Sequence, residues 1–200
     1  MLKNQFKSEI KNTKTPSSSP KAKKKNKVKN LYGSTKRFAS NEKTKQVAGL
    51  LFVLFSIYLL IAFCSFIFTW RADQSKLESG SSILFNSDIN VENWLGKLGA
   101  LVSHFFIFDG FGIASFVFVV LFFLIGFKAL FGISLLPFGR TFRYSFFGLI
   151  WVSAALAFIF SDNLFILGGS VGYEINLWLD SVLGRAGTGL LLSFFLLAFL

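Results

Sequence analysis

Long stretches without a charged residue set the strongest limit on how this 200-residue chain can fold. Four such stretches occur, at residues 47–70, 110–127, 144–161 and 186–200. As an α-helix the first would be about 36 Å long, because each residue adds about 1.5 Å, and the hydrocarbon core of a bilayer is about 30 Å thick. Only 16% of the residues are charged, against about 25% in soluble domains, so an ordinary soluble enzyme is excluded.

We interpret the four stretches as membrane-spanning helices, because backbone polar groups in lipid must be bonded within the chain. Strands of a membrane barrel would alternate polar and apolar residues, which these stretches do not. The sequence therefore predicts an all-α integral membrane fold with four spans in residues 47–200, the fourth of them short. The first span follows a polar stretch of 46 residues, too late for a cleavable signal, and is expected to be an uncleaved anchor.

The distribution of Lys and Arg predicts the orientation of these spans. Residues 1–46 hold 14 basic residues and the connection 128–143 holds three, giving 17. The connections 71–109 and 162–185 hold three and one, giving four, and each has a net charge of −2. Because basic connections stay in the cytoplasm, we expect the N-terminus and the connection 128–143 on the inside and the other two connections on the outside.

Residues 1–46 form a basic tail rich in Lys, Ser and Asn, which we expect to be disordered because it has too little apolar surface to offset the entropy of folding. Six lysines lie between positions 21 and 29. The simplest interpretation is a topology signal and solvated linker. Adhesion to anionic lipid is a second possibility, and non-specific contact with nucleic acid is a third, less favoured because few aromatic residues are available for stacking.

Two amphipathic helices are predicted in the outward connections, lying along the membrane surface. Their apolar stripes are Trp94, Leu95, Leu98, Leu101, Val102 and Phe105 in the first, and Val171, Ile175, Trp178, Leu179, Val182 and Leu183 in the second. We expect Trp94 and Trp178 to sit at headgroup depth. Glycine-rich breaks at 109–112 and at 184–187 should turn the chain into the following spans. Both helices carry an Asn near a Trp and a Leu, which suggests a weak internal duplication.

Residues capable of chemistry are few, and none is predicted to form a catalytic, cofactor-binding or metal site. His104 shares a polar stripe with Lys97 and is expected to be a solvated surface residue, because a metal site needs three or four converging ligands. Cys64 lies among Phe and Ile within the first span and should be inert. No phosphate-binding loop of the form GxxxxGK[ST] occurs. Gly168 and Gly172 have the spacing of a helix-packing motif, although a loop or helix start is favoured there.

Six short motifs at the span boundaries give the chain a family resemblance. They are FASNEKT (38–44), FTWRADQS (68–75), NWLGKLGA (93–100), FGIASF (111–116), GGSVGY (168–173) and GRAGTG (184–189). In their order and placement, residues 38–200 resemble the N-terminal four-span membrane domain of the FtsK/SpoIIIE DNA translocases, which act in bacterial cell division.

The resemblance implies a non-catalytic anchor in the inner membrane at the division septum, in contact with other divisome membrane proteins. In this family the anchor tethers a hexameric cytoplasmic motor that uses ATP and Mg²⁺ to pump double-stranded DNA, coupling chromosome segregation to division. No position here matches the motor, so we expect it beyond Leu200 and no cofactor in these residues. The alternative is a small polytopic transporter or channel subunit, although the four stretches contain none of the intramembrane charge typical of those classes.

Overall fold

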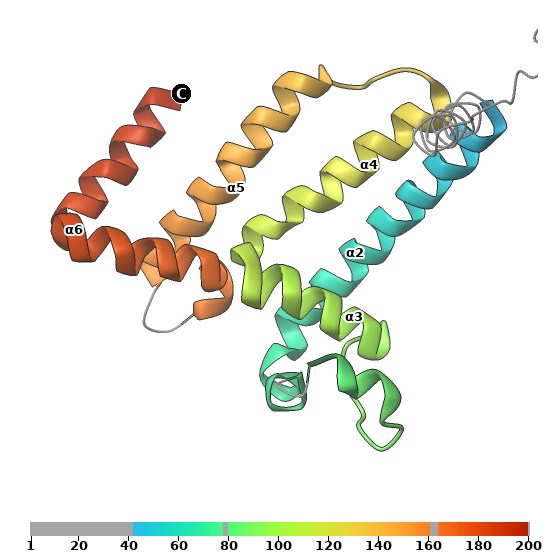
Figure 1. The fold of residues 1–200 in the computed structure, drawn as a ribbon, viewed down its shortest axis with the longest axis horizontal. Coiled ribbons are helices and arrows are strands. Elements are labelled where there is room, and N and C mark those ends of the chain that lie inside the picture. The colour runs from blue at the N-terminus through green and yellow to red at the C-terminus, as the bar shows by residue number, and fades with distance from the viewer. Residues whose placement is uncertain (1–41, 78–79, 161–163, 200) are drawn as a thin grey trace, which may run out of the picture. The chain divides into compact units, whose positions relative to one another are not determined.

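The computed structural model describes residues 42–77, 80–160 and 164–199, and every regular element in these ranges is helical (Figure 1). The chain divides into two units, Met1–Lys45 and Gln46–Leu200, and the second is described below. The predicted disorder of the tail falls mostly outside the described residues. The elements are α2 (Glu42–Leu77), η2 (Gly80–Phe85), α3 (Gly96–Ser103), η3 (His104–Phe111), η4 (Gly112–Ser115), α4 (Phe116–Phe131), α5 (Phe138–Phe160) and α6 (Phe165–Phe199).

The predicted all-helical architecture with four spans is confirmed, because four helical stretches are long and apolar enough to cross a membrane. The ends of the helices differ from the predicted spans. Helix α2 begins at Glu42, before residue 47, and continues past Trp70 to Leu77. Helix α4 begins at Phe116 rather than at residue 110, because η3 and η4 precede it, and it ends at Phe131. Helix α5 begins at Phe138 rather than at residue 144. An uncharged stretch predicts only the part of a helix that lies in the hydrocarbon core. The helix itself can extend into the headgroup region, where long basic side chains reach water.

Helices α2 and α4 pack antiparallel along positions spaced seven apart on α2, of which the first two, Gly49 and Ser56, are small residues. A Cβ atom placed on Gly126 would lie 2.8 Å from the carbonyl oxygen of Gly49, so neither helix can carry a side chain at this crossing. Seven residues along α2, Ser56 Oγ donates a hydrogen bond of 2.8 Å to the carbonyl of Val119. Seven further, Phe63 is fully buried in the main apolar cluster. Close approach through small and hydroxyl residues is the usual way in which helices associate in lipid.

Glycines bend the chain where the sequence predicts breaks. Gly112 has φ +63° and ψ −144°, a conformation that residues with a Cβ rarely adopt, and it separates η3 from the helix that continues into α4. Gly184 has φ +69° and ψ 162° and divides α6 into an arm that follows Gly169 and a final arm of residues 185–199. Figure 1 shows these two arms of α6 meeting at a sharp angle. We call residues 92–111 the first interfacial segment and residues 170–183 the second.

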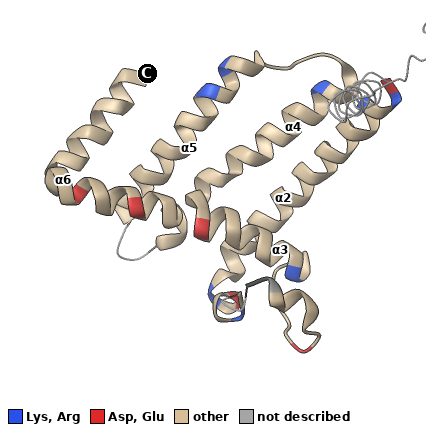
Figure 2. Ribbon diagram, in the orientation of Figure 1, with Lys and Arg blue, Asp and Glu red and all other residues tan. Residues whose placement is uncertain are grey.

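The α5–α6 pair contacts the first pair chiefly at these bends. A Cβ on Gly112 would clash with the backbone of Leu167 and Gly168, and the rings of Phe108 and Phe165 lie 4.9 Å apart. Figure 2 shows acidic residues on η3 and on the first arm of α6, and basic residues on the ends of α4 and α5 that flank their connection. The charged groups of this unit therefore lie outside the four uncharged stretches, near helix ends and on the first arm of α6, as expected for a chain that crosses lipid.

Candidate functional site

A fully buried carboxylate holds the start of the first interfacial segment against α2. Asp73 is 0% exposed, and its two oxygens accept hydrogen bonds from the backbone N–H of Glu92 at 2.8 and 3.1 Å and from that of Asn93 at 3.1 Å. Lys76 lies 3.5 Å away from the same carboxylate. A buried charge persists only when it is paired or hydrogen-bonded, and these backbone donors meet that requirement. Asp73 therefore has a structural explanation that needs no ligand.

The hydrogen bonds continue along the same strip of backbone. The N–H of Trp94 donates to Ser65 Oγ at 2.9 Å, and that of Leu95 donates to Asn93 Oδ1 at 3.0 Å. In return, Asn93 Nδ2 donates to the carbonyl of Ala62 at 3.1 Å. Side chains thus satisfy four consecutive backbone N–H groups in the connection immediately before α3, where no regular structure supplies partners for them. Asp73 lies in the motif FTWRADQS and Asn93 in the motif NWLGKLGA, but their spacing in the sequence does not indicate that the two motifs are hydrogen-bonded to each other.

The second interfacial segment is held against α5 in a related way. Asn176 Nδ2 donates to the carbonyl of Ala154 at 2.7 Å, and Ser153 Oγ donates to the carbonyl of Gly168 at 2.7 Å. A Cβ on Gly168 would lie 2.7 Å from the backbone of Ala157, and one on Gly172 would clash with Ser153. The glycine pair therefore serves as a close-packing motif as well as a helix start, so the interpretation as a loop or helix start alone was incomplete.

The two interfacial segments share a plan, which bears on the predicted duplication. In each, an Asn amide donates to the carbonyl of an Ala in the preceding span, Asn93 to Ala62 and Asn176 to Ala154. The two residues differ in register, because Asn93 precedes α3 whereas Asn176 follows the bend at Gly169. The common bonding supports a repeated arrangement of span, interfacial segment and span, and a duplication in sequence stays a prediction.

Large apolar side chains cover the outer surface of the interfacial segments. Trp94 is 68% exposed and Trp178 is 65% exposed, and Leu98 and Phe105 are exposed beside Trp94 along the predicted stripe. The protein-facing side of α3 instead consists of the buried residues Gly99, Ala100 and Ser103. The first predicted stripe is thus only partly exposed, because its other members Leu95, Leu101 and Val102 pack against the apolar core. The location of both segments at the membrane surface stays a prediction.

His104 differs from its predicted environment. Its side chain is only 17% exposed, lies against the ring of Phe108 with centroids 4.8 Å apart, and places Nδ1 3.1 Å from Asp109 Oδ2. Spacing along one helix could not identify these partners, because the π-helical turn of η3 shifts the register after Ser103. Lys97, its predicted neighbour on the polar stripe, donates instead to the carbonyl of Asn86.

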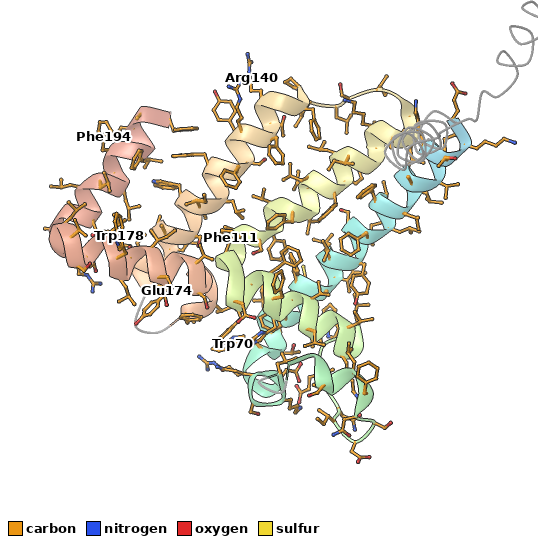
Figure 3. All side chains as sticks on the ribbon, viewed as in Figure 1. Trp70, Phe111, Arg140, Glu174, Trp178 and Phe194 are labelled. Atoms are coloured by element: carbon orange, nitrogen blue, oxygen red, sulfur yellow. The ribbon has the colours of Figure 1, made fainter. Side chains whose placement is uncertain are left out.

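Two further features concern the chemistry available in the described residues. Cys64 is unpaired and partly buried within α2, and no group of three or more His, Cys, Asp or Glu in residues 42–77, 80–160 and 164–199 is arranged to hold a metal ion. An open apolar cleft of about 580 Å³ lies between α5 and the two arms of α6. Its walls include Phe146, Ile150, Trp178 and Leu191. Figure 3 labels Trp178 and Phe194 on the two arms of α6.

These features define a class of protein: a helical membrane region with four spans, in which two bent interfacial segments are fastened to the spans by side chain to backbone hydrogen bonds. A family model of the 4TM region of DNA translocase FtsK/SpoIIIE matches residues 41–200, and the chain belongs to this family. The family resemblance found in the sequence is thereby confirmed. Comparison with curated proteins and with solved structures gave no match.

Proposed function

We propose that this chain is the membrane anchor and septal targeting domain of a DNA translocase that couples chromosome segregation to cell division. The observation that carries the proposal is the family match over residues 41–200. In this proposal the region is non-catalytic, and it occupies the bacterial inner membrane with its N-terminus and the connection 128–143 in the cytoplasm. The count of 17 basic residues on one predicted side against four on the other supports that orientation.

The anchor would act by fixing a motor and its partners at one place in the membrane. An ATPase motor of this family, with its ATP and Mg²⁺, would be carried by sequence outside these 200 residues, would pump double-stranded DNA and would assemble as a hexamer. The residues described here do not fit ATP or Mg²⁺, because the sequence has no phosphate-binding loop, and we assign them no step of that reaction. Divisome membrane proteins would contact the exposed apolar faces of the spans, which are rich in Phe and Leu.

Localisation tests the targeting role directly. A fluorescent protein fused to the chain should give a band at midcell in dividing cells of the source bacterium. A uniform signal around the cell periphery, with the fusion intact and inserted, would contradict septal targeting. Reading the gene beyond codon 200 tests the motor separately: a linker leading to GxxxxGK[ST] is expected, and a stop codon would contradict it.

The transporter or channel alternative gains no support from the described residues. Such proteins place ionisable groups along a path through the membrane. The fully buried carboxylate here, Asp73, lies beyond the first uncharged stretch, and both of its oxygens are bonded to backbone N–H groups. Conductance or uptake assays on the purified chain in liposomes should therefore give no signal above that of empty liposomes.

A further inference from the structure

A small cavity with both polar and apolar walls lies under the second interfacial segment, apart from the apolar cleft. Its volume is about 170 Å³, enough for several water molecules or one small organic group, since a water in the liquid occupies about 30 Å³. Ala157, Phe158 and Leu177 form apolar parts of its wall, and the residues with polar groups are Tyr173, Asn176, Asp180 and Arg185. These residues come from α5 and from both arms of α6, so the cavity exists only because Gly184 bends the chain.

Asn176, one of the residues that line this cavity, has an unused acceptor in its side-chain amide. Asn176 is 7% exposed, and its nitrogen donates to the carbonyls of Ala154 at 2.7 Å and Gly172 at 2.8 Å. Both amide hydrogens are therefore used, and reversing the amide would set its oxygen against two carbonyls. The orientation is thus fixed, and Oδ1 is left buried without a hydrogen-bond partner among the described residues. A buried acceptor in this state carries a free-energy cost that a donor from a ligand would remove.

Asp180 adds a second unused acceptor one helical turn further on. Its Oδ1 is also buried without a partner in the described part of the chain. Residues four apart lie on the same face of a helix, so the Asn176 and Asp180 side chains share one face of α6 and line the same cavity. Arg185 does not come within ion-pair distance of Asp180, and its guanidinium instead lies 5.6 Å from the ring centroid of Phe158. The cavity thus offers two acceptors, one of them anionic, and a separate cation.

We propose that this cavity binds the headgroup of a phospholipid with a primary ammonium, of the phosphatidylethanolamine type. The ammonium would donate to Asn176 Oδ1 and to the Asp180 carboxylate, and the phosphate would pair with the guanidinium of Arg185. This arrangement supplies the hydrogen-bond donors that the two oxygens lack and matches each charge with its opposite. The neighbouring exposed apolar residues Leu177, Trp178 and Val182 place the cavity on the part of the chain that faces lipid, where such headgroups are concentrated. A choline headgroup, whose nitrogen is fully methylated, has no N–H to donate.

Native mass spectrometry of the detergent-solubilised chain, titrated with phosphatidylethanolamine or phosphatidylcholine of identical acyl chains, tests the proposal. We expect one retained phosphatidylethanolamine per chain, with phosphatidylcholine bound at least 10-fold more weakly. Asp180→Asn removes the charge at nearly constant shape and should weaken phosphatidylethanolamine binding by roughly 10- to 100-fold, the range for a charge-assisted hydrogen bond. Arg185→Gln should weaken it as well.

Glu174→Gln is the matched control, because Glu174 lies on the same arm of α6, is exposed and does not line the cavity. This variant should bind phosphatidylethanolamine as the unmodified chain does. Helical circular dichroism identical to that of the unmodified chain establishes that Asp180→Asn folds. Equal binding of the two lipids, unchanged binding by folded Asp180→Asn, or a cavity that holds water only and retains neither lipid would overturn the proposal. Each of these outcomes leaves the proposed anchoring function untouched, because septal localisation is measured separately.

Discussion

Removing the Asp73 carboxylate should release the start of the first interfacial segment from α2. In Asp73→Ala the N–H groups of Glu92 and Asn93 lose their acceptor, because the three bonds of 2.8 to 3.1 Å all end on this carboxylate. A hydrogen bond to a charged group contributes about 1.5–3 kcal/mol, so two donors would give about 3–6 kcal/mol. Glu92 is exposed and water can reach its N–H, which favours the lower limit of about 3 kcal/mol.

Losing about 3 kcal/mol of the free energy that holds the segment closed raises the population of the locally opened state by roughly 100-fold, since each 1.4 kcal/mol is a factor of ten in an equilibrium constant. Amide hydrogen exchange reports this population when opening is local. We therefore expect exchange in a peptide covering residues 89–96 to be about 100-fold faster in Asp73→Ala, in detergent or in nanodiscs. Asp73→Asn retains one acceptor oxygen, so its exchange rate should lie between those of the unmodified chain and Asp73→Ala, about 10-fold above the unmodified chain.

The matched control is Asp88→Ala, which removes an exposed carboxylate from the same connection and should leave the exchange unchanged. Exchange in the α4–α5 connection provides an internal reference in every variant. If the amide hydrogens of residues 92 and 93 exchanged as slowly in folded Asp73→Ala as in the unmodified chain, the conclusion that Asp73 holds this segment against α2 would be refuted.

Two further predictions concern helix packing and orientation. Gly126→Val should destabilise the chain by about 1–3 kcal/mol, the usual cost of overpacking, because a Cβ there lies 2.8 Å from the backbone of Gly49, whereas Gly148→Val meets open space. Thermal unfolding of both variants measures the difference, and equal midpoints would contradict the packing. In a Cys64→Ser background, Asp88→Cys should react with a membrane-impermeant maleimide on intact spheroplasts, and Ser134→Cys should react only after lysis. The reverse pattern would contradict the predicted orientation.

The sequence predicted those features that depend on composition along a short length of chain. Uncharged stretches locate helices in lipid, and Gly184 marks a bend because glycine readily adopts a positive φ. Features that depend on contacts between distant segments were not predicted. Asp73 is bonded to residues 19 and 20 positions away, and His104 was displaced from its expected surface by a π-helical turn. The unused oxygen of Asn176 likewise depends on contacts of its amide nitrogen with the carbonyls of Ala154 and Gly172.

The glycine bends have a consequence for how freely this sequence can vary. Gly112 and Gly184 set the course of the chain through backbone angles, and a side chain at either position would be strained. Where the large apolar residues on the outside of the spans would meet lipid and not a partner protein, the surroundings distinguish little between Phe, Leu and Ile. Tolerance to substitution should therefore differ strongly between positions. Exchanges among those outward residues would change the stability of the fold little, whereas alanine at a few glycines would destabilise it strongly. Relatives with this architecture could share little sequence apart from a sparse set of small residues.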